Sequence, residues 1–103
     1  MIRVIIEREI VAGLEAFYEK EVAKLLDIMT AAPGYLSGES LVDLQKPNHY
    51  VVITRWTDES AWERWCQSSQ RQQLVDAIQP FLQSDEKQTR LTQLFFHQDK
   101  SAN

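Results

Sequence analysis

The chain has 103 residues, which suffice for one domain with a single modest core. Its composition, 44% hydrophobic and 25% charged, is typical of a globular protein, and no apolar run approaches the roughly 20 residues that a membrane helix needs. The 11 basic and 15 acidic residues give a net charge of −4, and the basic residues are scattered singly, so neither a nucleic-acid nor a membrane partner is expected.

The first half of the chain predicts a strand, a long helix and a second strand. β-Branched residues dominate positions 2–10, and the charged second half suits a strand end that emerges into solvent. Apolar residues recur every three or four positions over 14–29, which predicts an amphipathic helix. A proline-glycine pair at 33–34 should end that helix and reverse the chain, before a less regular strand over 35–44.

The second half begins with the strongest strand pattern, residues 49–56, after a hairpin loop. Its alternation places four side chains on one face: Tyr50, Val52, Thr54 and Trp56. Thr57 is the expected cap of the following helix, which a polar run should break near Ser68. Residues 91–96 predict the last strand.

This order predicts an α+β fold, a ferredoxin-like βαββαβ antiparallel sheet with helices on one face. The domain should span residues 1–97, with a polar tail at 98–103. The strands carry apolar residues on both faces, as Val51 and Ile53 alternate with Val52, so the sheet face away from the helices needs a cover. A homodimer packed sheet to sheet is the simplest cover.

Three tryptophans fall within ten residues where the 49–56 strand meets the next helix: Trp56, Trp62 and Trp65. Such large rings fill a core or line a cavity, and the helical spacing of the last two also suits simple packing onto the sheet. If a pocket exists, this junction is where it is expected. The predicted substrate-binding residues are Trp56, Trp65, Tyr50, Thr54 and Tyr35.

Other chemistry finds little support in the sequence. His49 and His97 lack a second ligand at metal spacing, so no metal site is expected, and no cofactor motif is recognised. Two acidic pairs favour a solvated surface role: Glu7 with Glu9, and Asp85 with Glu86. Cys66 is the single cysteine, and the first residues carry a charge inside the apolar run, so we expect a cytoplasmic protein without a secretory signal.

Two phrases, at 32–38 (APGYLSG) and 56–65 (WTDESAWERW), together with the order of elements, resemble the antibiotic biosynthesis monooxygenase family over about residues 2–96. The resemblance implies a ferredoxin-like dimeric α/β barrel. It also implies a choice of activities, because that family includes cofactor-independent monooxygenases of polycyclic phenols or quinols, haem-degrading enzymes and members without an assigned activity.

Some residues match the functional positions of the family and others do not. Trp56 matches the pocket tryptophan of the polyketide-oxidising members, but the asparagine they carry four residues earlier is Val52 here. Trp65 matches the helix tryptophan of the haem-degrading branch, but the iron-binding histidine of that branch is Val75, and its first-strand asparagine is Arg8. Valine cannot bind iron, which weakens the haem interpretation.

Three functions follow as alternatives. The leading one is a cofactor-independent monooxygenase that orients a small aromatic phenol or quinol in a dry pocket, with Tyr50 or Thr54 as hydrogen-bonding groups and the tryptophans as stacking surfaces. The second is a haem-binding or haem-degrading protein. The third is a non-catalytic dimeric ligand-binding protein.

Overall fold

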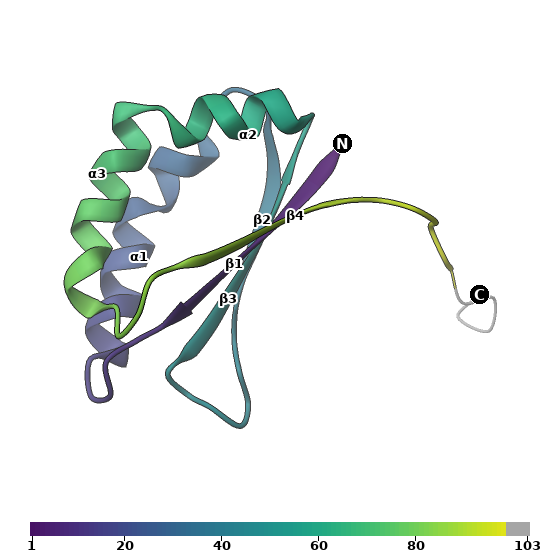
Figure 1. The fold of residues 1–103 in the computed structure, drawn as a ribbon. Coiled ribbons are helices and arrows are strands. Elements are labelled where there is room, and N and C mark those ends of the chain that lie inside the picture. Colours follow the sequence, from purple (N-terminus) through teal and green to yellow (C-terminus); the bar gives the residue numbers. More distant parts are fainter. Residues whose placement is uncertain (99–103) are drawn as a thin grey trace.

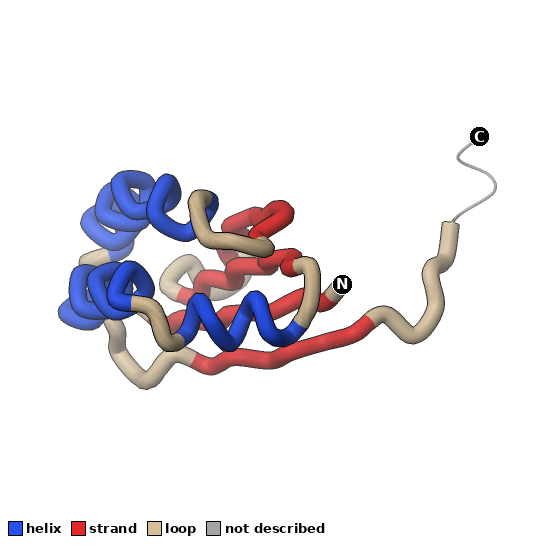
Figure 2. Tube along the Cα trace, turned by 90° about the horizontal axis from the view of Figure 1, so that it is seen from above, coloured by secondary structure: helices blue, strands red, loops and turns tan. Residues whose placement is uncertain are grey.

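The computed structural model describes residues 1–98 and contains a four-stranded antiparallel sheet covered by helices on one face (Figures 1 and 2). The strand order is β2-β3-β1-β4, which confirms the predicted ferredoxin-like α+β fold. The elements are β1 (Ile2–Glu9), α1 (Glu15–Thr30), β2 (Tyr35–Val42), β3 (His49–Trp56), α2 (Glu59–Cys66), α3 (Ser69–Ile78), the short 3-10 helix η1 (Gln79–Phe81) and β4 (Lys87–Thr92).

The core lies between the helices and one face of the two central strands. On β3 the alternation is as predicted, because every second residue from Tyr50 to Trp56 is buried and the residues between them are half-buried. On β1 the same face carries Val4, Ile6 and Arg8, which pair across the strands with the buried residues of β3. Arg8 is only 6% exposed, so the expectation that the charged half of this strand emerges into solvent was wrong for this residue.

Local signals set the ends of the helices. The break predicted near Ser68 is present, and the Ser68 side chain caps α3 by accepting a hydrogen bond from the Arg71 N–H at 3.1 Å. The cap of α2 is Asp58, whose carboxylate accepts from the Ala61 N–H at 2.8 Å. Thr57 was the wrong prediction, because it lies one residue before the cap, where its N–H donates to the Gly34 carbonyl at 2.9 Å just beyond the end of β3.

The last strand lies earlier than the predicted 91–96. β4 pairs with β1 from Lys87 to Thr92, where it faces Ile2, and beyond that point β1 offers almost no further partner. The following side chains are therefore left exposed: Leu94 at 83%, Phe95 at 72% and Phe96 at 71%. This segment runs away from the body of the domain in Figure 1. Most of the predicted polar tail, residues 99–103, lies outside the described residues.

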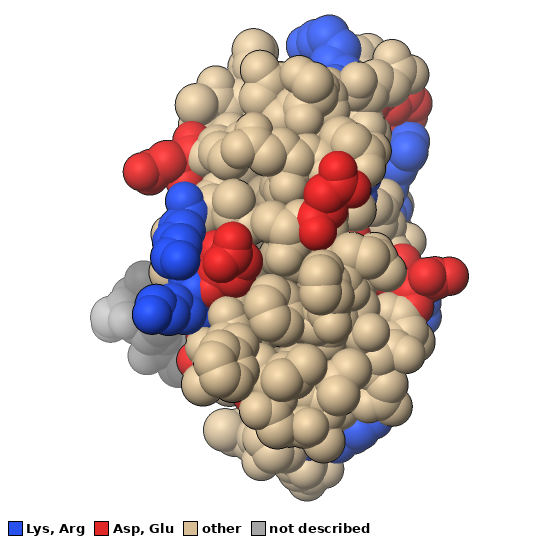
Figure 3. Space-filling model, turned by 90° about the vertical axis from the view of Figure 1, so that its left-hand side faces the viewer, with Lys and Arg blue, Asp and Glu red and all other residues tan. Residues whose placement is uncertain are grey.

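None of the helices within residues 1–98 is long and apolar enough to span a membrane. Figure 3 shows the side of the molecule formed by α1 and α3, where uncharged atoms dominate and the basic side chains lie toward the margins. This side therefore offers no broad basic surface of the kind that binds a phosphate backbone.

Candidate functional site

The three tryptophans pack against one another at the junction of β3 and α2. Trp56 and Trp62 are fully buried and Trp65 is 5% exposed. The Trp56 ring lies 5.4 Å from that of Trp62 in an edge-to-face arrangement and 6.3 Å from that of Trp65, nearly stacked. Tyr35 adds a fourth ring, 5.5 Å from Trp56. These aromatic pairs fill the junction with their own side chains.

The polar groups of Trp56 and Thr54 bond inside the protein, whereas the buried Trp62 Nε1–H has no hydrogen-bond partner among the described residues. The Trp56 Nε1–H donates to the Thr54 hydroxyl at 2.9 Å, and that hydroxyl donates to the Val4 carbonyl at 3.3 Å. Neither Thr54 nor Trp56 lines the cavities described below. Their predicted contact with a substrate therefore stays a prediction.

A groove of about 270 Å³ lies between α1 and the neighbouring strands β2 and β3. It is open to solvent and mostly apolar, with a few polar groups along its walls. Its lining residues are Tyr18, Glu19, Val22, Ala23, Leu26, Ser40, Leu41, Val42, Tyr50 and Val52. Concave apolar sites with few polar groups are the usual form of small-molecule sites.

Of the predicted substrate-binding residues, Tyr50 lines this groove. Its hydroxyl donates to a Glu19 carboxylate oxygen at 2.5 Å, and its ring packs on Tyr18 with 4.7 Å between the ring centres. Burial of the ring, followed by the neighbouring Glu19 carboxylate, raises the pKa of Tyr50 far above its ordinary value. Tyr50 therefore stays a neutral hydrogen-bond donor at physiological pH.

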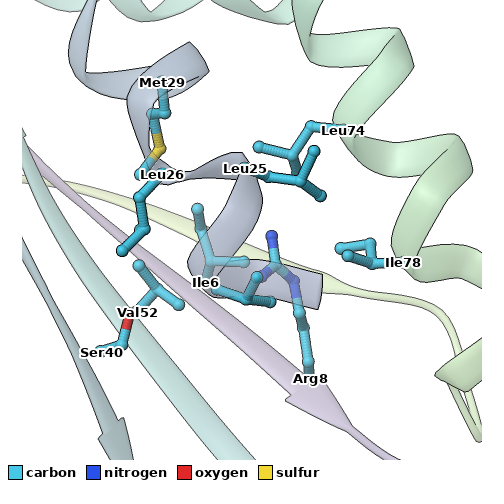
Figure 4. Close-up of a pocket in the computed structure, with 10 residues that line it drawn as sticks. Ile6, Arg8, Leu25, Leu26, Met29, Ser40, Val52, Leu74 and Ile78 are labelled. Carbon is cyan, nitrogen blue, oxygen red and sulfur yellow. The ribbon is translucent and has the colours of Figure 1, made fainter. Parts of the chain in front are cut away.

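The groove continues inward to a small chamber between β1, α1 and α3 (Figure 4). The two spaces share four lining residues: Val22, Leu26, Ser40 and Val52. The chamber measures about 20 Å³, room for one or two atoms the size of a water oxygen. Its other lining residues are apolar except for one: Ile6, Arg8, Leu25, Met29, Leu74 and Ile78.

Arg8 enters this chamber from β1, with its guanidinium directed toward the apolar residues of the helices (Figure 4). Its Nη1 donates to the Tyr18 hydroxyl at 3.0 Å and its Nη2 to Glu86 at 3.4 Å. Glu86 also pairs with Arg71 on α3 at 3.7 Å. The Glu86 side chain is only 11% exposed, so the expectation of a solvated surface role was wrong for this carboxylate.

The remaining predicted residues lie elsewhere. Trp65 lines a separate cavity of about 210 Å³ beside the end of α1, together with Pro33 and Arg64. Tyr35 packs on Trp56, and burial raises the pKa of its hydroxyl. The five predicted residues therefore do not surround a single space.

Sequence reasoning missed the inner residues of the groove, although two signals were present. Arg8 continues the inward alternation of Val4 and Ile6, which is unusual for a charged side chain. Tyr18, Val22 and Leu26 recur every four residues on α1 and share one face of that helix. The sequence predicts an amphipathic helix here without saying that part of its apolar face borders a groove.

The arrangement suits a flat, largely apolar molecule that carries oxygen substituents. The groove offers the Glu19 carboxylate and the neutral Tyr50 hydroxyl near its mouth, and a cation at its narrow end. Within the part of the chain that the structure describes, no group of three or more His, Cys, Asp or Glu side chains is placed to hold a metal ion.

Known proteins share this fold. SnoaB from Streptomyces nogalater, a cofactor-independent oxygenase, matches 92% of this chain with 95% of its own, at a TM-score of 0.79 and 23% identity. A crystal structure of an antibiotic biosynthesis monooxygenase matches 91% of this chain with 99% of its own, at a TM-score of 0.81 and 22% identity. At such identities the likeness establishes the fold alone.

A relative in sequence and a family model also match this chain. Protein SchA from Streptomyces halstedii is 21% identical over 81 residues, which cover 79% of this chain and 21% of SchA. The chain thus spans about a fifth of the length of that relative. The family model of antibiotic biosynthesis monooxygenase matches residues 1–77, well over half of the sequence. The chain therefore belongs to the antibiotic biosynthesis monooxygenase family.

Proposed function

We propose that this protein is a cofactor-independent monooxygenase that oxidises a small aromatic phenol or quinol with dioxygen. The observation that carries the proposal is the apolar groove with its tyrosine pair, Tyr18 and Tyr50, and its carboxylate, Glu19. The groove offers flat rings an aromatic surface, and its hydrogen-bonding groups suit hydroxyl substituents.

In this proposal the protein orients the substrate and excludes water from it, and the substrate itself reduces dioxygen. Glu19 accepts a hydrogen bond from a ring hydroxyl at the mouth of the groove, and Tyr50, which donates to the same carboxylate, fixes the position of that carboxylate. For a substrate of the anthrone type, the ring CH₂ becomes C=O with one oxygen atom of O₂, and the other leaves as water. The two hydrogens lost from the carbon appear in that water, so no external reductant is needed.

The test is oxygen uptake in an oxygen electrode with a panel of naphthols, anthrones and quinols. A bulky side chain at Ala23, which lines the groove, should block it, whereas Ala16 lies elsewhere on the exposed surface of α1. We expect Ala23→Trp to lose at least tenfold in substrate-dependent uptake and Ala16→Trp to keep it. Absence of uptake by the unmodified protein over the whole panel would refute the proposal. A Soret shift on titration with hemin would favour the haem alternative instead.

We further propose that the protein is a homodimer packed through the open face of its sheet. That face carries a patch of half-buried and exposed apolar side chains: Ile5, Leu41, Val51, Ile53 and Leu91. The exposed Phe95 and Phe96 add to the apolar surface of the same chain. Contiguous apolar surface of this kind marks an interface more often than a free surface.

Sedimentation velocity tests the assembly. Ile53→Lys places a charge at the centre of the open face and should shift the protein toward monomer at micromolar concentration. Phe17→Lys is the matched control, since Phe17 is 62% exposed on α1, which covers the other face of the sheet. A monomeric unmodified protein, or equal effects of both variants, would contradict the dimer.

A further inference from the structure

The narrow end of the groove holds a cation whose hydrogen-bonding capacity is only partly used. A guanidinium carries five N–H donors. Arg8 directs one to the Tyr18 hydroxyl and one to Glu86, while its buried Nε–H meets no acceptor among the described residues. The residue is 6% exposed, and a buried donor without an acceptor is costly. An acceptor brought in by a ligand would remove that cost.

The charges around Arg8 do not cancel. The cluster contains two guanidinium groups, on Arg8 and Arg71, against the single Glu86 carboxylate. Their side chains are 7%, 18% and 11% exposed, so water screens the excess charge poorly. A buried excess of one positive charge favours an anion at this end of the groove.

Tyr18 extends this cation into the groove. Its hydroxyl oxygen accepts the hydrogen bond from Arg8, so the hydroxyl proton is free to point to another acceptor. Tyr18 also lines the groove, and its ring packs on Tyr50. A hydroxyl polarised by a neighbouring cation is a stronger donor than an isolated one.

The two ends of the groove therefore carry opposite charge. At the mouth, Glu19 and nearby Glu15 from α1 carry negative charge beside the neutral Tyr50 of β3. At the inner end, Arg8 from β1 and Arg71 from α3 outweigh Glu86, which precedes β4. An ionised ligand is repelled at one end and attracted at the other, which orients it with its anionic oxygen inward.

We propose that Arg8 and Tyr18 form an anion-binding end of the groove, which holds the ionised oxygen of a flat aromatic ligand, a phenolate or an enolate. The inference rests on the proposed function, because it takes the groove as the substrate site. It adds the substrate class, an acidic phenol or enol bound as its anion. The anion is the electron-rich form that gives up electrons to dioxygen, so Arg8 would select the reactive form.

The probe for this site is 4-nitrophenol, whose ionised form absorbs visible light. Equilibrium dialysis measures its binding, and a pH titration with protein in excess measures the pKa of the bound probe. We expect binding to lower that pKa by about one to three pH units, the range for an opposite charge within contact distance. Ala23→Trp should abolish this binding, because Ala23 lines the groove.

Substitutions of Arg8 and of Glu86 should move the pKa of the bound probe in opposite directions. Arg8→Met removes the excess charge and leaves Glu86 paired with Arg71, so the pKa should return toward that of the free probe. Glu86→Gln removes the competing carboxylate and should lower the pKa further. Tyr18→Phe deletes only the hydroxyl and should raise it by less than Arg8→Met does. Lys20→Met, an exposed charge on α1, is the matched control and should change nothing.

Several results would overturn the inference: no binding at millimolar probe, binding that survives Ala23→Trp, an unchanged or raised pKa, or equal effects of Arg8→Met and Lys20→Met. If Arg8→Met does not fold, Glu86→Gln and Tyr18→Phe still decide the question. The pKa of the bound probe is measured without any catalytic turnover. If the protein prefers the anion but shows no oxygen uptake, the anion site is supported and the monooxygenase activity is refuted. If oxygen uptake occurs without a preference for the anion, the activity is supported and the anion site is refuted.

Discussion

Thr54→Val should destabilise the protein through a single lost acceptor. The Thr54 hydroxyl is fully buried and accepts the Trp56 Nε1–H at 2.9 Å. Valine has nearly the same shape, so the packing is kept while the indole N–H is left buried without an acceptor. That loss costs about 1–3 kcal/mol, and each kcal/mol corresponds to a shift of about 4–8 °C in Tm for a domain of roughly this size.

Urea unfolding at one fixed protein concentration measures this cost, with Thr92→Val, an exposed position at the end of the edge strand β4, as the matched control. We expect the control to stay within about 0.5 kcal/mol of the unmodified protein. In a Trp56→Phe background the indole N–H is absent, so Thr54→Val should cost about 1 kcal/mol less there. If the two substitutions are additive, or if Thr54→Val is neutral, the hydrogen bond does not stabilise the core as argued.

Two further predictions concern the turns. Gly34 has a φ of +87°, and a Cβ there would overlap that of Ala61, so Gly34→Ala should cost more than about 2 kcal/mol in thermal unfolding; a neutral effect would contradict the tight approach of α2. The hydrogen bond to Asp43 raises the pKa of His49 above its ordinary 6.5. The resulting stabilisation is complete below pH 6.5 and is lost as the pH rises through the raised pKa. The free energy of unfolding of His49→Gln should therefore depend less on pH between pH 6 and 8 than that of the unmodified protein. An equal pH dependence of the two proteins would refute the ion pair.

The sequence predicted the fold well because its local signals agree. Alternation on β3, the four-residue spacing on α1 and the reversal at Gly34 each point to one topology. The errors fell where tertiary pairing overrides local pattern. The apolar run at 91–96 resembles a strand, yet the ladder ends at Thr92 because β1 begins at Ile2.

The candidate site was harder to predict, because residues that share a strand face need not share a cavity. Tyr50 and Trp56 lie on the same face of β3, but six residues at about 3.3 Å each separate them by roughly 20 Å. A two-ring substrate does not span that distance. The groove also depends on how α1 packs over β2 and β3, a contact between segments far apart in the sequence that no local pattern encodes.

Val52 links the groove to the chamber, since it lines both. Its side chain gives β3 no polar group at this point, and Ser40 of β2 is the one polar residue among the four that line both spaces. The neighbouring strand β1 supplies a charge instead: its Ile6 pairs with Val52 of β3, and the next residue of β1 on the same face is Arg8. Three of the four shared lining residues are apolar, and the field of a cation is stronger across a mostly apolar passage than across a wet one. The charged contact at the inner end of the groove therefore comes from β1, through Arg8, and not from the passage itself.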